Sequence, residues 1–153
     1  MAEIRIAKSP DDLSKYKSEI ITLLYENLAL NLPEEGWDME DAFAQVSSLL
    51  LNIAEGNAQF FLAEEEGHLV GFAWTYRRRV GKRNRLHINH IIIRSGRRNE
   101  GTGTKLLNAI ISKAREMKVD SIDLMSSKTR ENVVRFYSRN GFSVERLQMV
   151  LKL

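Results

Sequence analysis

An apolar segment that runs into a basic, glycine-bearing loop constrains this chain more than any other feature. Residues 91–107 read Ile-Ile-Ile-Arg-Ser-Gly-Arg-Arg-Asn-Glu-Gly-Thr-Gly-Thr-Lys-Leu-Leu, and an amphipathic pattern follows at once. The order predicts a strand, a loop and a helix start, where free N–H groups and the helix dipole favour an anion. Gly101 and Gly103 allow close approach to the backbone, and Arg97 and Arg98 add charge. The segment therefore predicts a site for a phosphate-bearing ligand.

Three phosphate-binding patterns can be compared with this loop. A Walker loop needs Gly-x-x-x-x-Gly-Lys-Ser/Thr, whereas residues 101–105 read Gly-Thr-Gly-Thr-Lys, with threonine before lysine. A dinucleotide fingerprint needs a small residue three positions after its second glycine, where this chain has the bulky Leu106. The pattern Arg/Gln-x-x-Gly-x-Gly/Ala fits residues 98–103 without adjustment. The loop thus resembles the coenzyme A loop of the N-acetyltransferases of the GNAT superfamily.

A second segment strengthens the resemblance. Residues 130–142 read Arg-Glu-Asn-Val-Val-Arg-Phe-Tyr-Ser-Arg-Asn-Gly-Phe. They are similar to the Asn/Arg-x-x-Ala-x-x-Phe-Tyr-x-x-x-Gly-Phe helix that closes the GNAT cofactor site, although Val133 stands where alanine is usual. Taken alone, the segment predicts only an amphipathic helix ended by Asn140-Gly141. Two segments in the family's order favour the family.

The expected elements follow the GNAT order β-α-α-β-β-β-α-β-α-β-β over a single domain, residues 1–153. The implied fold class is α/β (α+β), the acyl-CoA N-acyltransferase fold, with a central, mixed, mostly antiparallel sheet flanked by helices. Strands are expected at 3–7, 58–65, 68–79, 86–93 and 119–125, with a terminal strand pair within 141–153. Helices are expected at 10–30, capped by Ser9, at 38–55, at 105–118 and from Arg130. The apolar residues expected to face inward from the first two helices are Leu13, Ile20, Leu24, Leu28, Phe43, Val46, Leu50 and Ile53.

Composition narrows the class of protein. Apolar residues make up 43% and charged residues 28% of the chain, as in ordinary soluble globular domains. The chain has no cysteine, which excludes disulfides, a cysteine nucleophile and thiolate metal ligands. Its three histidines do not form a familiar zinc spacing. We therefore expect a cytoplasmic protein with no metal and no membrane association.

The resemblance implies transfer of an acetyl group from acetyl-CoA directly to a primary amine. Tyr137 matches the general acid that protonates the departing thiolate, although its ring could instead only pack beneath the pantetheine arm. The backbone N–H groups of Ile91 and Ile93 match those that meet the thioester carbonyl and the pantetheine amides. The side chains and glycines implied to hold the cofactor are Arg98, Asn99, Gly101, Gly103, Thr104 and Asn132.

The sequence does not identify the base that accepts the proton of the amine. Several relatives carry a glutamate on the strand before the loop, but residues 86–93 contain none. Strict alternation would place His87 and Asn89 on the side of Ile91 and Ile93, with His90 opposite. Histidine has a suitable ordinary pKa of about 6.5, so His87, with Asn89 beside it, is the first candidate. His90 and bulk water are the alternatives.

The acceptor is suggested by the distribution of charge. Residues 1–66 carry 4 basic and 14 acidic residues, a net of −10, while residues 67–153 carry 19 and 6, a net of +13. The segment between the first two helices contains Glu34, Glu35, Asp38, Glu40 and Asp41. These carboxylates would attract a cationic small molecule or a lysine-rich peptide, or they form a solvated run of charge.

Two other functions compete with catalysis. Residues 76–85 carry six basic residues at an expected hairpin tip, which would suit a binding module for RNA or the ribosome. Tyr76 is the single aromatic there, so base stacking is poorly supported and nucleic acid is disfavoured. A catalytically silent CoA-binding GNAT domain is the other alternative. The resemblance also implies pairing as a homodimer, because many relatives are dimers.

Overall fold

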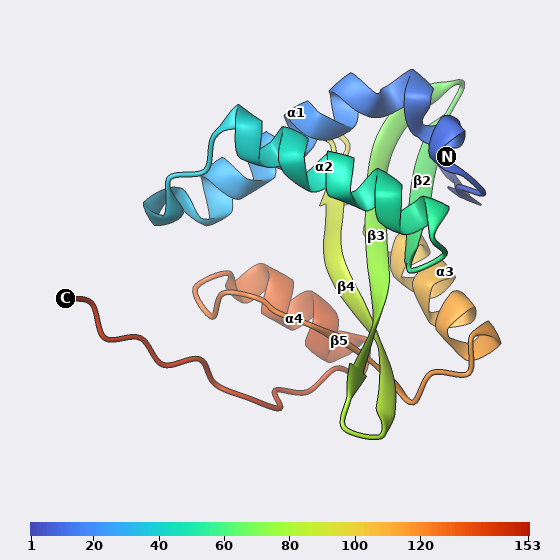
Figure 1. Cartoon of the computed structure of the whole chain (residues 1–153). Coiled ribbons are helices and arrows are strands. Elements are labelled where there is room, and N and C mark those ends of the chain that lie inside the picture. Colours follow the sequence, from blue (N-terminus) through green and yellow to red (C-terminus); the bar gives the residue numbers. More distant parts are fainter.

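The chain folds into one five-stranded sheet with helices on both faces (Figure 1). The computed structural model describes residues 1–153. The strands are β1 (Glu3–Ile6), β2 (Ala58–Glu65), β3 (His68–Val80), β4 (Arg83–Ile93) and β5 (Ser121–Leu124). The helices are α1 (Lys17–Asn31), α2 (Met39–Ala54), α3 (Thr102–Glu116) and α4 (Glu131–Arg139), with short 3₁₀ helices at Pro10–Tyr16 and Pro33–Glu35. This architecture confirms the predicted fold class.

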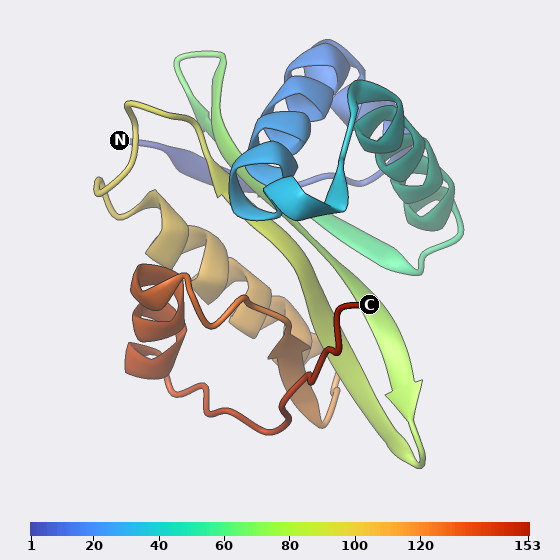
Figure 2. The same ribbon diagram turned by 90° about the vertical axis from the view of Figure 1, so that its left-hand side faces the viewer.

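The sheet order is β1-β2-β3-β4-β5, and every neighbouring pair is antiparallel except β4 and β5, which are parallel. Figure 2 shows α1 and α2 on one face of the sheet and α3 and α4 on the other. Because strand side chains alternate between faces, β2 supplies both layers and is central, as its continuous apolar run predicts. None of the helices is long and apolar enough to span a membrane.

The two faces have separate cores. Seventeen buried residues form the core under α1 and α2, where the rings of Phe60, Phe72 and Trp74 stack, with Phe60 and Phe72 centroids 5.4 Å apart. Eleven buried residues form the core under α3, around Phe61 and Leu106. Burying such a ring stabilises the fold by roughly 1.5–3 kcal/mol, so both layers contribute to the stability of the sheet between them.

The N-terminal helix differs from the prediction at its start. The chain forms a 3₁₀ helix over Pro10–Tyr16 and becomes α-helical only at Lys17. Ser9 precedes it in an extended conformation but makes no side-chain cap. The predicted inward residues of this segment are nonetheless buried, since a 3₁₀ turn changes the local pitch and not the apolar sequence.

The second helix is rotated from the predicted orientation. Its buried residues are Ala42, Val46, Leu49 and Ile53. Phe43 is exposed, because it lies one residue, about 100°, around the helix from Ala42. The prediction for Phe43 was therefore wrong.

The predicted terminal strand pair is also absent. Residues 143–153 form no helix or strand, and the end of the chain runs away from the body of the molecule (Figure 1). The alternating apolar pattern is real, but the segment has no strand beside it. The sheet consequently ends at β5.

Candidate active site

A gap in the sheet lies beside the second half of β4. β5 pairs with β4 only from Arg85 to Ile88, and the remainder of β4 has no strand on that side. The N–H of Arg94 donates to the carbonyl of Val70 on β3, at 2.8 Å. Successive N–H groups along a strand point to opposite edges, so those of Ile91 and Ile93 point away from β3 and into the gap.

The glycine-bearing loop brings orphan N–H groups next to this gap. Asn99 and Gly101 both have positive φ, 63° and 82°, which turns the chain sharply into α3 at Thr102. No side chain caps α3, so its first N–H groups, at Thr102, Gly103 and Thr104, are available to an anion. Arg98 is exposed and has no acidic partner. The loop thus has the elements of a pyrophosphate site.

Arg97 forms its ion pairs within the protein. Its guanidinium pairs with Glu65 on β2 and with Glu100, 3.0 Å away in the same loop. These bonds raise the pKa of Arg97 further and brace the loop against the sheet. Arg98 is therefore the arginine left for a phosphate.

The two glycines of the loop should respond differently to alanine. Gly101 has φ 82°, where a side chain costs about 1–2 kcal/mol. Gly103 is helical, and an added Cβ would meet only Phe136, at an ordinary 3.8 Å. We expect Gly101→Ala to lower the unfolding midpoint and weaken CoA binding. Gly103→Ala should fold at least as well, since alanine favours a helix by roughly 0.5–1 kcal/mol. Equal effects in thermal melts would contradict this reading of the loop.

Tyr137 of α4 reaches the same face as the gap. Its ring packs between Phe136 and Phe142, with centroids 5.1 and 5.2 Å away, in the cluster that contains Ile91 and Ile93. Burial raises the pKa of Tyr137 to about 12, an effect that the nearby Arg130 only partly offsets. The phenol therefore stays protonated and able to donate. Asn132 lies exposed in the first turn of α4 and makes no hydrogen bond.

A β-bulge changes the orientation of the histidines. Trp74 is opposite His90, but the next residue, Thr75, is opposite Ile88, so Asn89 is the extra residue of β4. One added residue reverses the alternation. His87 therefore lies on the face of α1 and α2, as does His90, and not on the side of Ile91 and Ile93 as predicted. The rings agree, since His90 lies 4.7 Å from Trp74 and His87 5.0 Å from Tyr76.

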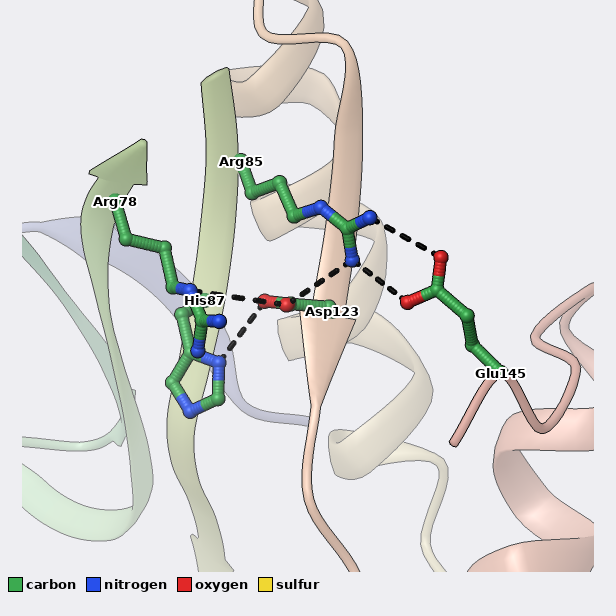
Figure 3. Close-up of polar contacts among 5 residues, drawn as sticks. All are labelled: Arg78, Arg85, His87, Asp123 and Glu145. Carbon is green, nitrogen blue, oxygen red and sulfur yellow. Dashed lines mark hydrogen bonds and ion pairs between the residues drawn. The ribbon is translucent and has the colours of Figure 1, made fainter. Parts of the chain in front are cut away.

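His87 forms a hydrogen-bonded pair with Asp123, a residue that was not among those predicted from the sequence. Its Nδ1 lies 2.9 Å from Oδ1 of Asp123, which is opposite it on β5 (Figure 3). A carboxylate can only accept, so in the neutral ring Nδ1 carries the proton and Nε2 keeps its lone pair. Nε2 has no hydrogen-bond partner in the protein, and the His87 side chain is 9% exposed. The bond to Asp123 thus fixes the orientation of the His87 ring and leaves Nε2 without a partner in the protein.

Three further charged residues surround Asp123 (Figure 3). Arg85 lies 3.4 Å from Asp123 and forms a two-pronged bond with Glu145, at 2.8 and 3.1 Å. Arg78 adds a 4.0 Å contact to Asp123. The bond to Arg85 lowers the pKa of Glu145. The two arginines and His87 thus hold the Asp123 carboxylate in place on β5.

His90 is a poorer base than His87. Burial, aided by the charges of His87 and Arg130, lowers the pKa of His90 to about 4. A group with a depressed cationic pKa takes up its proton first in the unfolded state, whose pKa is about 6.5. Its stabilising effect is present above pH 6.5 and is lost as the pH falls toward 4, by on the order of 2 kcal/mol. We expect His90→Phe to lose less stability than wild type between pH 7 and 4.5 in urea titrations; parallel losses would contradict the shift.

An open groove of about 640 Å³ lies on the α2 side of the bulge. Asn89 and Tyr76 line it beside His87, and Trp74 lies in its wall. Its other polar lining residues are Gln45, Ser48, Asn52, Asn57 and Arg77. Amide and hydroxyl groups, and no carboxylate, therefore line the space next to His87.

The acidic residues predicted to attract a polycation do not line this groove, and three of them already bond to other groups of the protein. Asp38 and Asp41 form a reciprocal capping box at the start of α2, with bonds of 2.9 and 3.0 Å. Glu34 pairs with Lys152 at 2.8 Å. Glu35 and Glu40 are left exposed without a basic partner.

The basic hairpin is likewise partly neutralised. Three of its six basic residues contact acids: Arg78 and Arg85 contact Asp123, and Arg83 lies 3.6 Å from Asp120. The charge left for RNA is about half of that predicted. No group of three or more histidine or acidic side chains is arranged to hold a metal ion.

Known proteins are similar to this chain in sequence and in fold. The model of the "Acetyltransferase (GNAT) family" matches residues 22–142, which include the loop, β4 and α4. A solved structure from Bacillus halodurans C-125, described as a transcriptional regulator, has a TM-score of 0.80 at 19% identity and covers 100% of both chains. At this identity the likeness shows the fold alone.

Two relatives are named mycothiol acetyltransferase. The protein of Propionibacterium freudenreichii subsp. shermanii is 38% identical over 81 residues, 53% of this chain and 26% of the relative. The protein of Acidimicrobium ferrooxidans is 30% identical over 115 residues, 74% of this chain and 36% of the relative. The chain thus spans well under half of the length of these relatives. Because the family model covers most of the chain, the predicted resemblance is confirmed, and this protein belongs to the acetyltransferase (GNAT) family.

Proposed function

We propose that this chain transfers an acetyl group from acetyl-CoA directly to a primary amine bound in the groove beside Asn89. The observation that carries the proposal is the bulge at Asn89. Tyr137 lies toward one face of β4, and the groove lies toward the other, where its lining residue Tyr76 contacts His87. Since β4 has no neighbour on its β5 side beyond Ile88, an acetyl donor and an amine can meet at this open edge.

The residues around the gap fit acetyl-CoA. Arg98, Asn99 and the free N–H groups from Gly101 to Thr104 suit its pyrophosphate. The N–H groups of Ile91 and Ile93 suit carbonyl oxygens, and Ile91 would stabilise negative charge that develops on the acetyl oxygen. Bound acetyl-CoA supplies an activated acetyl thioester. Asn132 is retained as a cofactor contact by its position in α4.

His87 and Asp123 would remove the acceptor's proton. An alkylammonium with a pKa of about 10.4 is neutral in only about one part in 2,500 at pH 7, a cost of roughly 4.6 kcal/mol. Nε2 of His87 can accept that proton while Asp123 holds the ring and stabilises the imidazolium. Asp123 is thus a positioning residue. Asn89, at the bulge, would orient the amine.

Tyr137 would supply the proton that the thiolate needs on leaving. Its pKa of about 12 keeps the hydroxyl protonated throughout the working range of pH. The hydroxyl makes no hydrogen bond within the protein, so it is free to donate. Proton acceptor and proton donor therefore lie on opposite faces of β4, and neither competes for the other's proton.

The lining of the groove favours binding of a polar amine that carries hydroxyl or amide groups over binding of a polycation. Its lining offers amides and hydroxyls for hydrogen bonds, whereas Arg77 would oppose a highly charged cation. The relatives named mycothiol acetyltransferase make mycothiol-type amines part of the same class to test. A cytoplasmic location remains a prediction from the cysteine-free composition.

Release of CoA thiol from acetyl-CoA against a panel of amines tests the proposal. The panel should contain amino sugars and mycothiol-type amines, spermidine, aminoglycosides, lysine-rich and N-terminal peptides, and a control without amine. We expect turnover with amino sugars or other polar amines, and little with spermidine. Tight CoA binding without turnover on any amine would favour the silent CoA-binding domain, and salt-sensitive RNA binding without turnover would favour the basic hairpin.

A further inference from the structure

One side of α4 faces the protein and carries an arginine at its start. The half-buried residues of the helix and its two flanking positions recur at helical spacing: Arg130, Val133, Val134, Phe136, Tyr137 and Asn140. Since seven residues make almost two full turns, Arg130 lies on the same side of the helix as Tyr137. Arg135 and Arg139 of the same helix are exposed.

Arg130 has no anionic partner in the protein. Its side chain makes no cap for α4, and no carboxylate is among the groups that act on its charge. Partial burial lowers the pKa of Arg130, and the positive charge of Arg98 adds to this effect. Holding a charge partly out of water without a partner costs stability, so such a group at a candidate site indicates an anionic ligand.

The charge of Arg130 acts on groups on both sides of the gap beside β4. It acts on the phenol of Tyr137, which packs in the cluster of Ile91, and on the imidazole of His90 on the other face. β5 ends its pairing with β4 at Ile88, so no strand fills the space beyond. The guanidinium therefore lies near the part of the gap that suits the acetyl thioester.

Tyr137 alone is a weak acid for a departing thiolate. Its pKa is about 12, whereas an ordinary alkyl thiol such as cysteine has a pKa of about 8.5. Because the phenol gives up its proton less readily than the thiol, proton transfer follows cleavage of the C–S bond, and sulfur carries negative charge as the bond breaks. A fixed positive charge beside sulfur stabilises this charge without losing a proton.

We propose that Arg130 is a further catalytic residue, whose guanidinium contacts the sulfur of bound acetyl-CoA and stabilises the thiolate as it leaves. This role rests on the proposed acetyl transfer. The amine nitrogen bonds to the acetyl carbon, and the C–S bond breaks with its electron pair on sulfur. The proton of Tyr137 then reaches sulfur, and the phenolate regains a proton from water. The surplus proton of the amine goes to Nε2 of His87, and Arg130 keeps its protons throughout.

The pKa of the thiol of bound CoA tests this role without any amine. The chain has no cysteine, so CoA is the single thiol in the complex. The ultraviolet absorbance of the thiolate is followed against pH, and the spectrum of the free protein is subtracted to remove the tyrosines. A positive charge close to a thiol lowers its pKa by about one or more, so the thiol pKa should be higher by that amount in Arg130→Gln than in the wild type. Arg130→Lys keeps the charge and should stay close to the wild type.

Arg135→Gln is the matched control, since it removes the same charge from an exposed position of the same helix. It should leave the thiol pKa and kcat unchanged. Arg130→Gln should lower kcat by about 10²-fold, with a smaller loss for an acetyl thioester of a more acidic thiol.

Equal thiol pKa values in the wild type and Arg130→Gln would overturn the proposal. So would loss of CoA binding in a folded Arg130→Gln, since that result would place the guanidinium at the phosphates. If the wild type acetylates no amine of the panel, the proposed function fails, but the titration still decides whether Arg130 contacts sulfur.

Discussion

Replacing Tyr137 with phenylalanine is expected to lower kcat for acetyl transfer by about 10²-fold or more, the usual contribution of a positioned acid. The substitution removes the hydroxyl that would protonate the departing thiolate and keeps the ring between Phe136 and Phe142. Because this hydroxyl has no partner in the protein, the unfolding midpoint and the affinity for CoA should change little. Steady-state kinetics, thermal melts and CoA titrations measure the three quantities.

The leaving group provides the control for this prediction. An acetyl thioester with a more acidic thiol needs less protonation, so the difference between Tyr137→Phe and wild type should shrink with such a donor. Wild-type activity should also show no loss from this tyrosine below about pH 11, since its pKa is about 12. Full activity of Tyr137→Phe with acetyl-CoA would contradict the acid role and show that the ring of Tyr137 only packs in the site.

The second large effect is expected at the His87–Asp123 pair. His87→Gln should lower kcat/KM near pH 7 by about 10²-fold and remove the rise in rate that accompanies deprotonation of an imidazole. Asp123→Asn should act similarly, because the amide can donate to Nδ1 and so place the ring proton on Nε2. The double variant should lose little more than either single one, since the two residues act as a unit.

His90 is the matched control for the pH profile. It lies on the same face, but its pKa of about 4 keeps it neutral across the working range. His90→Gln should therefore retain the wild-type profile, and Asp123→Glu should restore part of the activity lost in Asp123→Asn. An unchanged profile in His87→Gln would remove this histidine from the mechanism and favour water as the proton acceptor.

Much of the fold can be predicted from the sequence because its signals are local. The continuous apolar run of β2 and the alternation in β3 give both strands to within one residue. The glycines and the basic residues after β4 mark the loop and the start of α3, which begins at Thr102, three residues before the prediction. Local pattern and family resemblance agree in this part of the chain.

The arrangement of the histidines could not be predicted in the same way. It depends on the bulge at Asn89, and one extra residue inverts every later side chain of the strand. Asn89 is a polar residue within an apolar strand, but that alone does not indicate a bulge. The bulge is set by the pairing of β4 with β3, which alternation along one strand cannot report.

The partner of His87 depends on the register between two strands that α3 separates in sequence. Asp123 lies opposite His87 only because β4 and β5 pair in parallel from Arg85 and Ser121 onward. A carboxylate inside a short predicted strand was the available signal, since aspartate is depleted in strands. For the C-terminal segment, the alternation of apolar residues predicts a strand, but residues 143–153 form none in the structure. Alternation alone does not provide the neighbouring strand with which such a segment would pair.

A single-turnover experiment tests the central claim most directly. Enzyme in excess over acetyl-CoA is mixed with the amine selected from the panel, and the intact masses of amine and protein are followed as CoA is released. Direct transfer predicts that the amine gains one acetyl group while the protein mass stays unchanged at every time. Acetylated protein that forms before the product, or CoA released without acetylation of the amine, would contradict direct transfer between the two faces of β4.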